Sequence, residues 1–148
     1  MRKMKTNDEG QFIQIIKGDS GACYEDQREV TWDEVTVASG IKEIDPQAEI
    51  REVTSLTKLE RRCFDWSKIN LREAIRYNRT IGRTFISINF MNYVDATLKG
   101  KRGTVKELTS HPKATRWLQD NVFPTLTGTK AVLKFLGTGA LTDDMLML

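Results

Sequence analysis

Hydrophobic residues gather in three short runs along the chain, and each run predicts a buried β-strand. The runs are Phe12–Ile16, Thr84–Met91 and Lys130–Leu136. The second run is rich in β-branched and aromatic residues and too continuous for an exposed strand, which favours a central position in a sheet. Glycines follow the first and third runs, at Gly18 and Gly137, where the chain needs conformational freedom to turn.

Three stretches between these runs have helical features. Thr31 and Glu34 form a capping-box pattern before a short helix that Gly40 ends. After a cap at Asp65 or Ser67, a second helix is predicted from the helical spacing of Leu71, Ala74, Ile75 and Asn78. A third begins at Pro112 behind Thr109 or Ser110 and ends at Pro124, with an apolar stripe of Ala114, Trp117, Leu118 and Val122. Residues 41–52 are predicted to be irregular.

The alternation of strands and helices predicts an α/β layer fold. We expect a small, mostly parallel sheet flanked by helices. The 148 residues suffice for one domain, here residues 11–148, preceded by a flexible N-terminus at residues 1–10. No apolar stretch approaches the roughly 18 residues of a membrane span, and no signal peptide is recognisable. A cytoplasmic location is expected, in the host cytoplasm if the protein is viral.

Charge and cysteine content narrow the function classes. The net charge is +3, and the Lys and Arg residues are scattered rather than clustered on one predicted face. That distribution argues against a dedicated nucleic-acid binder. Cys23 and Cys63 lack the spacing of a metal site and are too few for a disulfide framework. No Gly-x-x-x-x-Gly-Lys-Ser/Thr phosphate loop is present.

Candidate chemistry lies where strands end, because open parallel sheets bind ligands beyond the carboxyl ends of their strands. That rule selects residues 18–21, 89–95 and 137–144. A fourth candidate is residues 54–62, where hydroxyls precede Arg61 and Arg62, groups suited to phosphate or ribose oxygens. Within the segment 137–144, simpler interpretations are favoured: a plain turn at residues 137–139 and solvated carboxylates at residues 143–144. The simpler interpretation of His111 is a helix start.

Five segments together resemble the adenylosuccinate synthetases, from about residue 13 to the end. Residues 57–66, Thr-Lys-Leu-Glu-Arg-Arg-Cys-Phe-Asp-Trp, resemble the Thr-Gly-Arg-x-Arg-Arg-x-Gly-Trp loop of that family. Residues 71–78 resemble its Leu-Arg-x-Ala-Val-x-x-Asn helix, and residues 88–95 lie where it has its base-recognition strand end. Residues 137–139 resemble the closing Ser/Gly-Thr-Gly-Pro segment. Residues 18–21 with residues 24–32 are most similar to the viral branch that makes 2-aminoadenylosuccinate.

The departures from the family pattern concern catalysis and base choice. The family's phosphate loop, catalytic Asp and catalytic His lie in an N-terminal half that this sequence does not match. Leu59 stands where the family has the Arg that grips aspartate, whereas the Arg that contacts ribose is retained as Arg61. Phe90 and Asn92 replace the Lys and Asp of the base site. Asn92 can both donate to and accept from an adenine edge, and Phe90 can stack on the base.

The resemblance implies a purine-nucleotide site and leaves two functions open. The first is a non-catalytic protein that sequesters or senses a purine nucleotide or nucleotide-derived signal. The second is the C-terminal chain of a split synthetase whose phosphate loop lies on another subunit. An adenine nucleotide or a related purine nucleotide is the expected ligand, and a homo-oligomer or a missing N-terminal half is the expected partner. The implied binding residues are Thr57, Lys58, Arg61, Arg62, Phe90, Asn92, Asp95, Gly137, Thr138 and Gly139, with a second ribose or loop site at Gly18, Asp19, Ser20 and Gly21.

Overall fold

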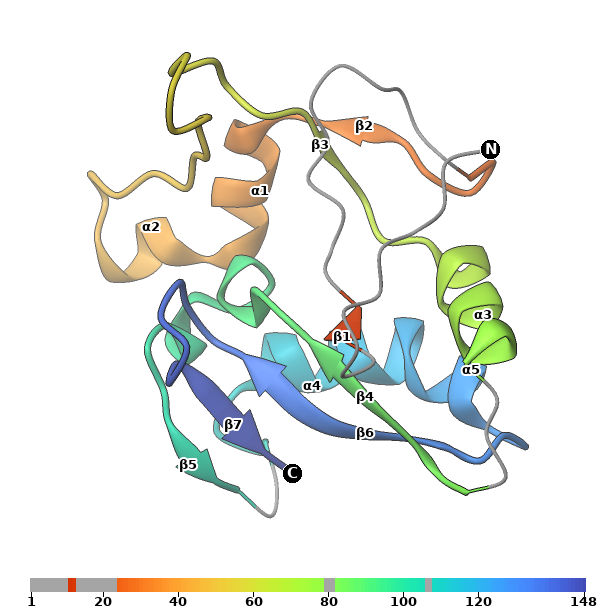
Figure 1. Cartoon of the computed structure of the whole chain (residues 1–148). Coiled ribbons are helices and arrows are strands. Elements are labelled where there is room, and N and C mark those ends of the chain that lie inside the picture. Colours follow the sequence, from red (N-terminus) through yellow and green to blue (C-terminus); the bar gives the residue numbers. More distant parts are fainter. Residues whose placement is uncertain (1–10, 13–23, 79–81, 106–107) are drawn as a thin grey trace.

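A five-stranded sheet organises the computed structural model, which describes residues 11–12, 24–78, 82–105 and 108–148. Its strand order is β1-β4-β6-β7-β5. Strands β1 (Gln11–Phe12), β4 (Thr84–Ile88) and β6 (Ala131–Gly137) run parallel (Figure 1). Strand β7 (Met145–Met147) pairs antiparallel with β6, and β5 (Gly103–Thr104) pairs parallel with β7. The predicted mostly parallel α/β sheet is confirmed.

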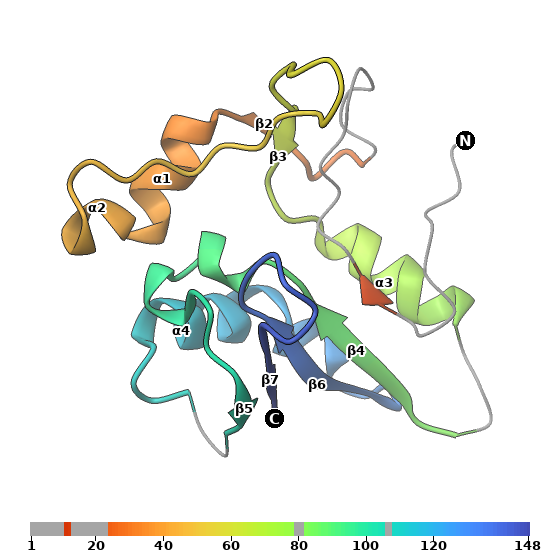
Figure 2. The ribbon, with the colours of Figure 1, turned by 60° about the vertical axis from the view of Figure 1, so that its left-hand side comes forward.

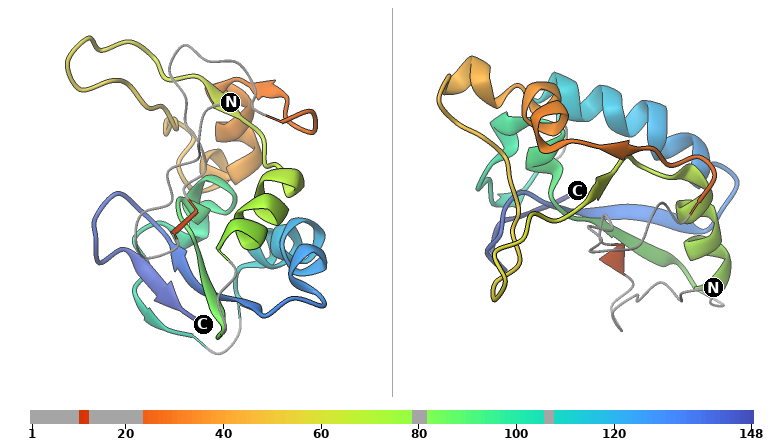
Figure 3. Two further views of the ribbon diagram at one scale, coloured as in Figure 1. Left: turned by 45° about the vertical axis from the view of Figure 1, so that its right-hand side comes forward. Right: turned by 90° about the horizontal axis from the view of Figure 1, so that it is seen from above.

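Helices cover one face of this sheet. Helices α3 (Lys68–Tyr77), α4 (Pro112–Asn121) and α5 (Phe123–Leu126) lie on the same side of β4, as the left view of Figure 3 shows for α3 and α4. The apolar stripe predicted for the third helix is confirmed for Ala114 and Leu118, which are buried. The main core joins these helices to the sheet through Leu71, Ala74, Ile75, Ile86, Ile88, Ala114, Leu118, Leu133 and Leu136.

A smaller unit packs beside the sheet (Figure 2). It contains helices α1 (Trp32–Ser39) and α2 (Ile41–Ile44) and an antiparallel pair of short strands, β2 (Glu29–Val30) and β3 (Cys63–Phe64). The predicted capping box is present at Thr31 and Glu34, and Gly40 ends α1 with a φ of 74°. A second core cluster holds the unit together, made of Trp32, Ile41, Ile50, Cys63 and Ala96.

Several predicted boundaries were wrong for identifiable reasons. Residues 41–44 are helical rather than irregular, because α2 starts directly from the left-handed Gly40. Pro124 does not end a helix but lies in the first turn of α5, where proline fits without losing a hydrogen bond. The N-cap of α4 is His111, without a side-chain capping bond, whereas Ser67 caps α3 as predicted. Residues 13–16 of the first predicted strand lie outside the described residues.

The central strand is shorter than its hydrophobic run. Strand β4 ends at Ile88, and a 3₁₀ turn, η1 (Met91–Tyr93), follows after a reversal at Phe90. A second 3₁₀ turn, η2 (Ala96–Leu98), completes the segment. In the part of the chain that the structure describes, no helix is both long and apolar enough to cross a membrane.

Candidate functional site

The carboxyl ends of β4 and β6 lie side by side and define a strand-end site, made of Asn89, Phe90, Asn92 and Gly137. Parallel pairing aligns Ile88 with Leu136, which brings the next residues, Asn89 and Gly137, into contact. A Cβ atom at Gly137 would lie 2.7 Å from Asn89 Oδ1 and 3.0 Å from Asn89 Cα. Glycine is therefore required at position 137 for the two strand ends to approach this closely.

Phe90 adopts a backbone conformation that L-amino acids rarely occupy. Its φ and ψ are 60° and 35°, in the left-handed region. Such strain in a bulky residue persists only where the surroundings enforce it, and it concentrates at functional sites. The Phe90 ring stacks on Tyr93 with centroids 5.3 Å apart and an interplanar angle of 18°. Tyr93 also meets Trp32 edge to face at 5.9 Å, so the aromatic pair is anchored to the smaller unit.

Asn92 carries an unused acceptor at the same place. Its Oδ1 atom is buried and has no hydrogen-bond partner in the structure as described. Leaving a buried polar atom unpaired typically costs about 1–3 kcal/mol. Buried polar groups are usually paired, so this unpaired acceptor makes Asn92 a candidate binding residue. The predicted base-binding residues Phe90 and Asn92 thus stand together on η1, directly after β4.

A chain of contacts links Arg61 to this aromatic pair. The backbone N–H of Arg61 donates to the carbonyl of Glu52 at 2.9 Å, and the Glu52 carboxylate accepts from the Tyr93 hydroxyl. Burial, and next the hydrogen bond to Glu52, raise the pKa of Tyr93 far above its ordinary value. Tyr93 and Glu52 were missed by sequence reasoning. The spacing of three residues between Phe90 and Tyr93 was the available signal, because such spacing brings side chains together on a helical turn.

Thr57 and Lys58 lie away from the strand-end site. They occupy the tip of an exposed hairpin closed by the pairing of Val53 with Glu60 and by a bond from Thr54 N–H to the Leu59 carbonyl at 2.9 Å. Figure 1 places this hairpin above α1 and Figure 2 places it above β3, in both views at the opposite end of the molecule from the large sheet. Of the predicted loop residues, Thr57 and Lys58 are thus set apart from the predicted base site, whereas the backbone of Arg61 is linked to it through Glu52 and Tyr93.

Arg62 has a local partner of its own. Its Nε atom donates to Glu29 Oε1 at 2.6 Å, and its guanidinium lies 5.4 Å from the centre of the Phe64 ring. The hydrogen bond lowers the pKa of Glu29. These contacts join β2 to β3, which gives Arg62 a structural role in the smaller unit.

Asp95 also holds the fold together. Its side chain accepts hydrogen bonds from the Thr97 amide at 3.1 Å, the Thr97 hydroxyl at 2.5 Å and the Ala114 amide at 3.1 Å. The bond to Ala114 caps α4 from a distant segment, and Thr97 in turn contacts His111 Nδ1 at 2.7 Å. Burial acts to raise the pKa of Asp95, but these hydrogen bonds outweigh it and lower the pKa below its ordinary value.

The Gly137-Thr138-Gly139 turn is tied to its neighbours at every polar atom of Thr138. The Thr138 hydroxyl donates to the Lys101 carbonyl at 2.6 Å, its N–H donates to the Asp144 carbonyl at 2.8 Å, and its own carbonyl accepts from Gly100 at 3.1 Å. A Cβ at Gly139 would lie 2.4 Å from Asp144 Oδ2. Thr138 and Gly139 therefore fix the turn, and Gly137 alone of the three contacts Asn89.

Asp144 is not the solvated carboxylate that the sequence favoured. Its side chain is only 10% exposed and accepts two hydrogen bonds from Arg102, at 3.0 Å and 2.8 Å. Asp143 does remain exposed. No group of three or more metal-ligating side chains occurs in residues 11–12, 24–78, 82–105 and 108–148. The second predicted site, Gly18 to Gly21, lies outside the described residues.

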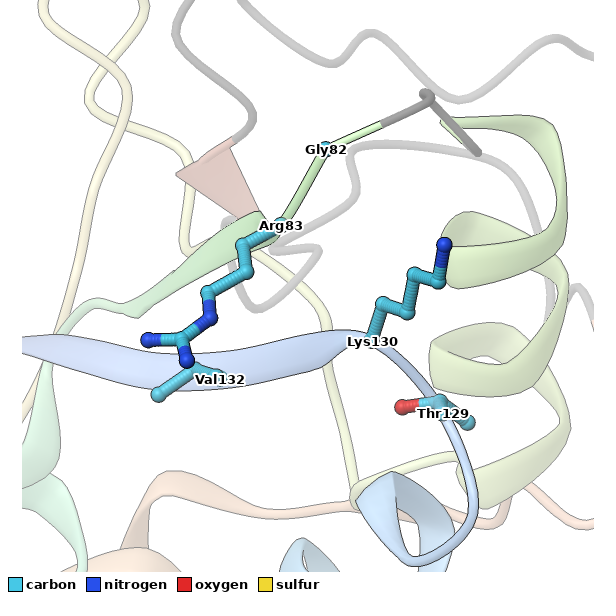
Figure 4. A pocket seen from close by; sticks show the side chains of 5 residues that line it. All are labelled: Gly82, Arg83, Thr129, Lys130 and Val132. Atoms are coloured by element: carbon cyan, nitrogen blue, oxygen red, sulfur yellow. The ribbon is translucent and has the colours of Figure 1, made fainter.

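Among the described residues, two cavities lie outside the strand-end site. One, of about 530 Å³, separates the smaller unit from α4 and is lined by Tyr93 and Val94 as well as Phe64, Trp66 and Trp117. Burial raises the pKa of Cys63, on its wall, to about 11, which keeps that thiol protonated. The other, of about 600 Å³, lies at the opposite ends of β4 and β6 and is lined by Gly82, Arg83, Thr129, Lys130 and Val132 (Figure 4).

Comparison with known proteins finds similarity in sequence and in fold to two viral synthetases. No family model matches the chain. Over 87 residues, 59% of the chain, it is 34% identical to N6-succino-2-amino-2'-deoxyadenylate synthase of Acinetobacter phage SH-Ab 15497. Over that segment the chain is similar in sequence to a viral adenylosuccinate-synthetase-like enzyme. Its fold is also similar to that of the cyanophage S-2L succinoaminodeoxyadenylate synthetase (PurZ), solved with dGMP and with dATP as an energy donor.

The similarity to these viral synthetases covers most of this chain but a small part of theirs. The structural match has a TM-score of 0.53 and 23% identity and covers 86% of this chain and 26% of the cyanophage chain. The sequence match covers 18% of the Acinetobacter phage synthase. The matched segments therefore span 18% and 26% of the lengths of these two synthetases.

Proposed function

We propose that the chain binds a purine nucleotide at the strand-end site and, by itself, does not perform the ligase reaction. The observation that carries the proposal is the contact of Asn89 with Gly137 at the carboxyl ends of two parallel strands. Ligands of open α/β sheets bind at such edges. The strained Phe90 and the unpaired Asn92 Oδ1 stand at the same edge.

Each residue of the proposed site has a chemical task. The Asn92 amide accepts from and donates to the edge of an adenine-type base, and the Phe90 ring packs against the face of the base. The Arg61 backbone is joined to Tyr93 through Glu52, and the Arg61 guanidinium is the proposed cation for ribose or phosphate oxygens. The nucleotides bound by the cyanophage synthetase support a purine ligand for this chain as well.

The partial coverage of the viral synthetases favours a second candidate function. The chain would then be one part of a synthetase whose phosphate-binding part lies elsewhere. The isolated chain, given IMP or dGMP, aspartate and either ATP or dATP, should form no succino-product. Turnover by the chain alone would contradict the first proposal, whereas turnover only after addition of a second polypeptide would support the split enzyme.

Asn92→Asp should weaken binding of adenine nucleotides and shift preference towards guanine nucleotides. Aspartate accepts but does not donate, so the adenine N7 and N1 acceptors lose their partner while the guanine N–H donors gain one. The expected penalty for adenine is about 1–3 kcal/mol, or roughly tenfold to a hundredfold in Kd. Calorimetric titration of both variants with dATP and dGMP measures it.

A matched control separates base reading from added charge. Asn121→Asp introduces the same charge at the end of α4, where the Asn121 side chain bonds the Trp117 carbonyl. It should leave the ratio of the two dissociation constants unchanged. If Asn92→Asp also leaves that ratio unchanged, Asn92 does not contact the base.

A further inference from the structure

One face of the large sheet carries exposed apolar side chains. Phe85 on β4, Val132 on β6 and Met147 on β7 are 45%, 42% and 39% exposed. Phe85 pairs in register with Val132, and Met147 pairs with Phe135. With Lys134, these three exposed residues define the open face. The opposite face is buried, since Ile86, Ile88, Leu133 and Leu136 are at most 7% exposed.

An open apolar face is unusual for this type of sheet. Sheets built from parallel strands occur almost only with both faces covered, because their central strands are apolar on both sides. Here α3, α4 and α5 cover one face, and Figure 1 looks onto the sheet with α4 and α5 behind it. Exposed apolar patches on sheets mark sites of association. Apolar side chains on both faces of these strands are typical of a sheet that lies between two covering layers.

The side chains around the open face are positively charged, which favours a partner with carboxylates. Lys134 Nζ lies over the Phe85 ring at 4.6 Å from its centre and 5.7 Å from that of Phe135. Arg83 and Lys130 stand at one end of the face, beside Val132, around the cavity of about 600 Å³ (Figure 4). Strands β4, β6 and β7 contain no acidic residue. A second copy of the chain would place these cations against each other, whereas carboxylates would pair with them.

We propose that the open face binds the part of a synthetase-like fold that this chain does not span, through an apolar surface edged by carboxylates. The chain covers only 26% of the cyanophage synthetase, so a large remainder exists to supply that layer. The contact is formed by Phe85, Val132 and Met147 at its centre and by Arg83, Lys130 and Lys134 at its rim. It lies away from the strand-end site, so nucleotide binding and this interaction fail independently.

The test uses the cyanophage S-2L synthetase without the part that aligns with this chain, because that alignment covers 86% of the chain. Circular dichroism first establishes that the remaining part of the synthetase is folded. Co-expressed with the tagged chain, it should co-purify as a one-to-one complex by light scattering. Val132→Lys should weaken the complex at least about tenfold, because it buries a charge at the centre of the contact. Val37→Lys is the matched control, since Val37 is 69% exposed on α1, away from the open face, and should leave the complex intact. Lys134→Glu should weaken it as well.

Three outcomes would overturn the proposal. The first is a folded wild-type chain that forms no complex with the folded remainder of the synthetase, or a complex that both valine variants weaken equally. The second is a homodimer of the chain alone that Val132→Lys dissociates, which makes the face a self-interface. The third is binding of a single-stranded oligothymidylate that Val132→Lys and Lys134→Glu abolish. Circular dichroism and a cooperative urea-unfolding transition establish that the variants fold.

Discussion

Replacement of Gly137 by valine should abolish nucleotide binding and destabilise the chain by about 1–3 kcal/mol, the usual cost of overpacking. Even the Cβ atom would lie 3.0 Å from the Cα atom of Asn89, and a backbone atom directly after a strand has no rotamer by which to move away. The ends of β4 and β6 would separate, and Phe90 and Asn92 would lose their positions. Calorimetric titration with dATP and urea unfolding measure the two effects.

Gly82→Val is the matched control for this substitution. No heavy atom lies within 4 Å of a Cβ built at Gly82, and Gly82 precedes the opposite end of β4. Its expected effect on the free energy of unfolding is within about 0.5 kcal/mol, as for most surface substitutions, with nucleotide affinity unchanged. A Gly137→Val variant that unfolds and binds like the wild type would show that the strand ends do not form the site.

Asp95→Asn should cost about 1–3 kcal/mol of stability at pH 7, because an amide accepts fewer hydrogen bonds than the buried carboxylate. The pKa of Asp95 is lowered in the folded chain, so its ionised form stabilises the fold above the unfolded pKa of about 3.9. That contribution is lost as the pH falls through the lower, folded pKa. The wild type should therefore lose more stability than the variant between pH 7 and pH 3.

Asp143→Asn provides the comparison, since the Asp143 side chain is 81% exposed. In urea unfolding at pH 7 and at pH 3, the stability of this variant should differ little from that of the wild type. An equal loss of stability in both variants at pH 7, or an acid dependence in Asp95→Asn as steep as in the wild type, would remove the capping role of Asp95 for α4.

Local sequence signals predicted the elements whose causes are local. The Thr31–Glu34 capping box and the Ser67 cap act within one helical turn, and both are present. The positions of β4 and β6 followed from their apolar runs. Strands β5 and β7 are only two and three residues long, too short for any periodicity, and β5 pairs with β7 from a distant part of the sequence, Gly103 with Leu146. The cap of α4 by Asp95 spans 19 residues and is a tertiary contact.

The site was predictable in part for the same reason. The rule for strand ends brings Asn89 next to Gly137, because pairing of parallel strands is enough to place them. The contact of Tyr93 with Glu52 spans 41 residues and has no local signature. Residues 57 and 58 were placed by motif alone, yet the hairpin that carries them projects away from the sheet. Asp144 was misjudged because its partner, Arg102, lies 42 residues earlier.

The most direct measurement is a melting-temperature shift of the isolated wild-type chain with purine nucleotides. At a concentration 100-fold above its Kd, a ligand stabilises the folded chain by about 2.7 kcal/mol. For a chain of this size the melting temperature should rise by about 5–10 °C. At least one compound among dATP, dGMP, other adenine nucleotides, ADP-ribose derivatives and cyclic oligonucleotides should give that shift, and Arg61→Ala should reduce it. No shift with any of these compounds, in a chain shown to be folded, would contradict nucleotide binding.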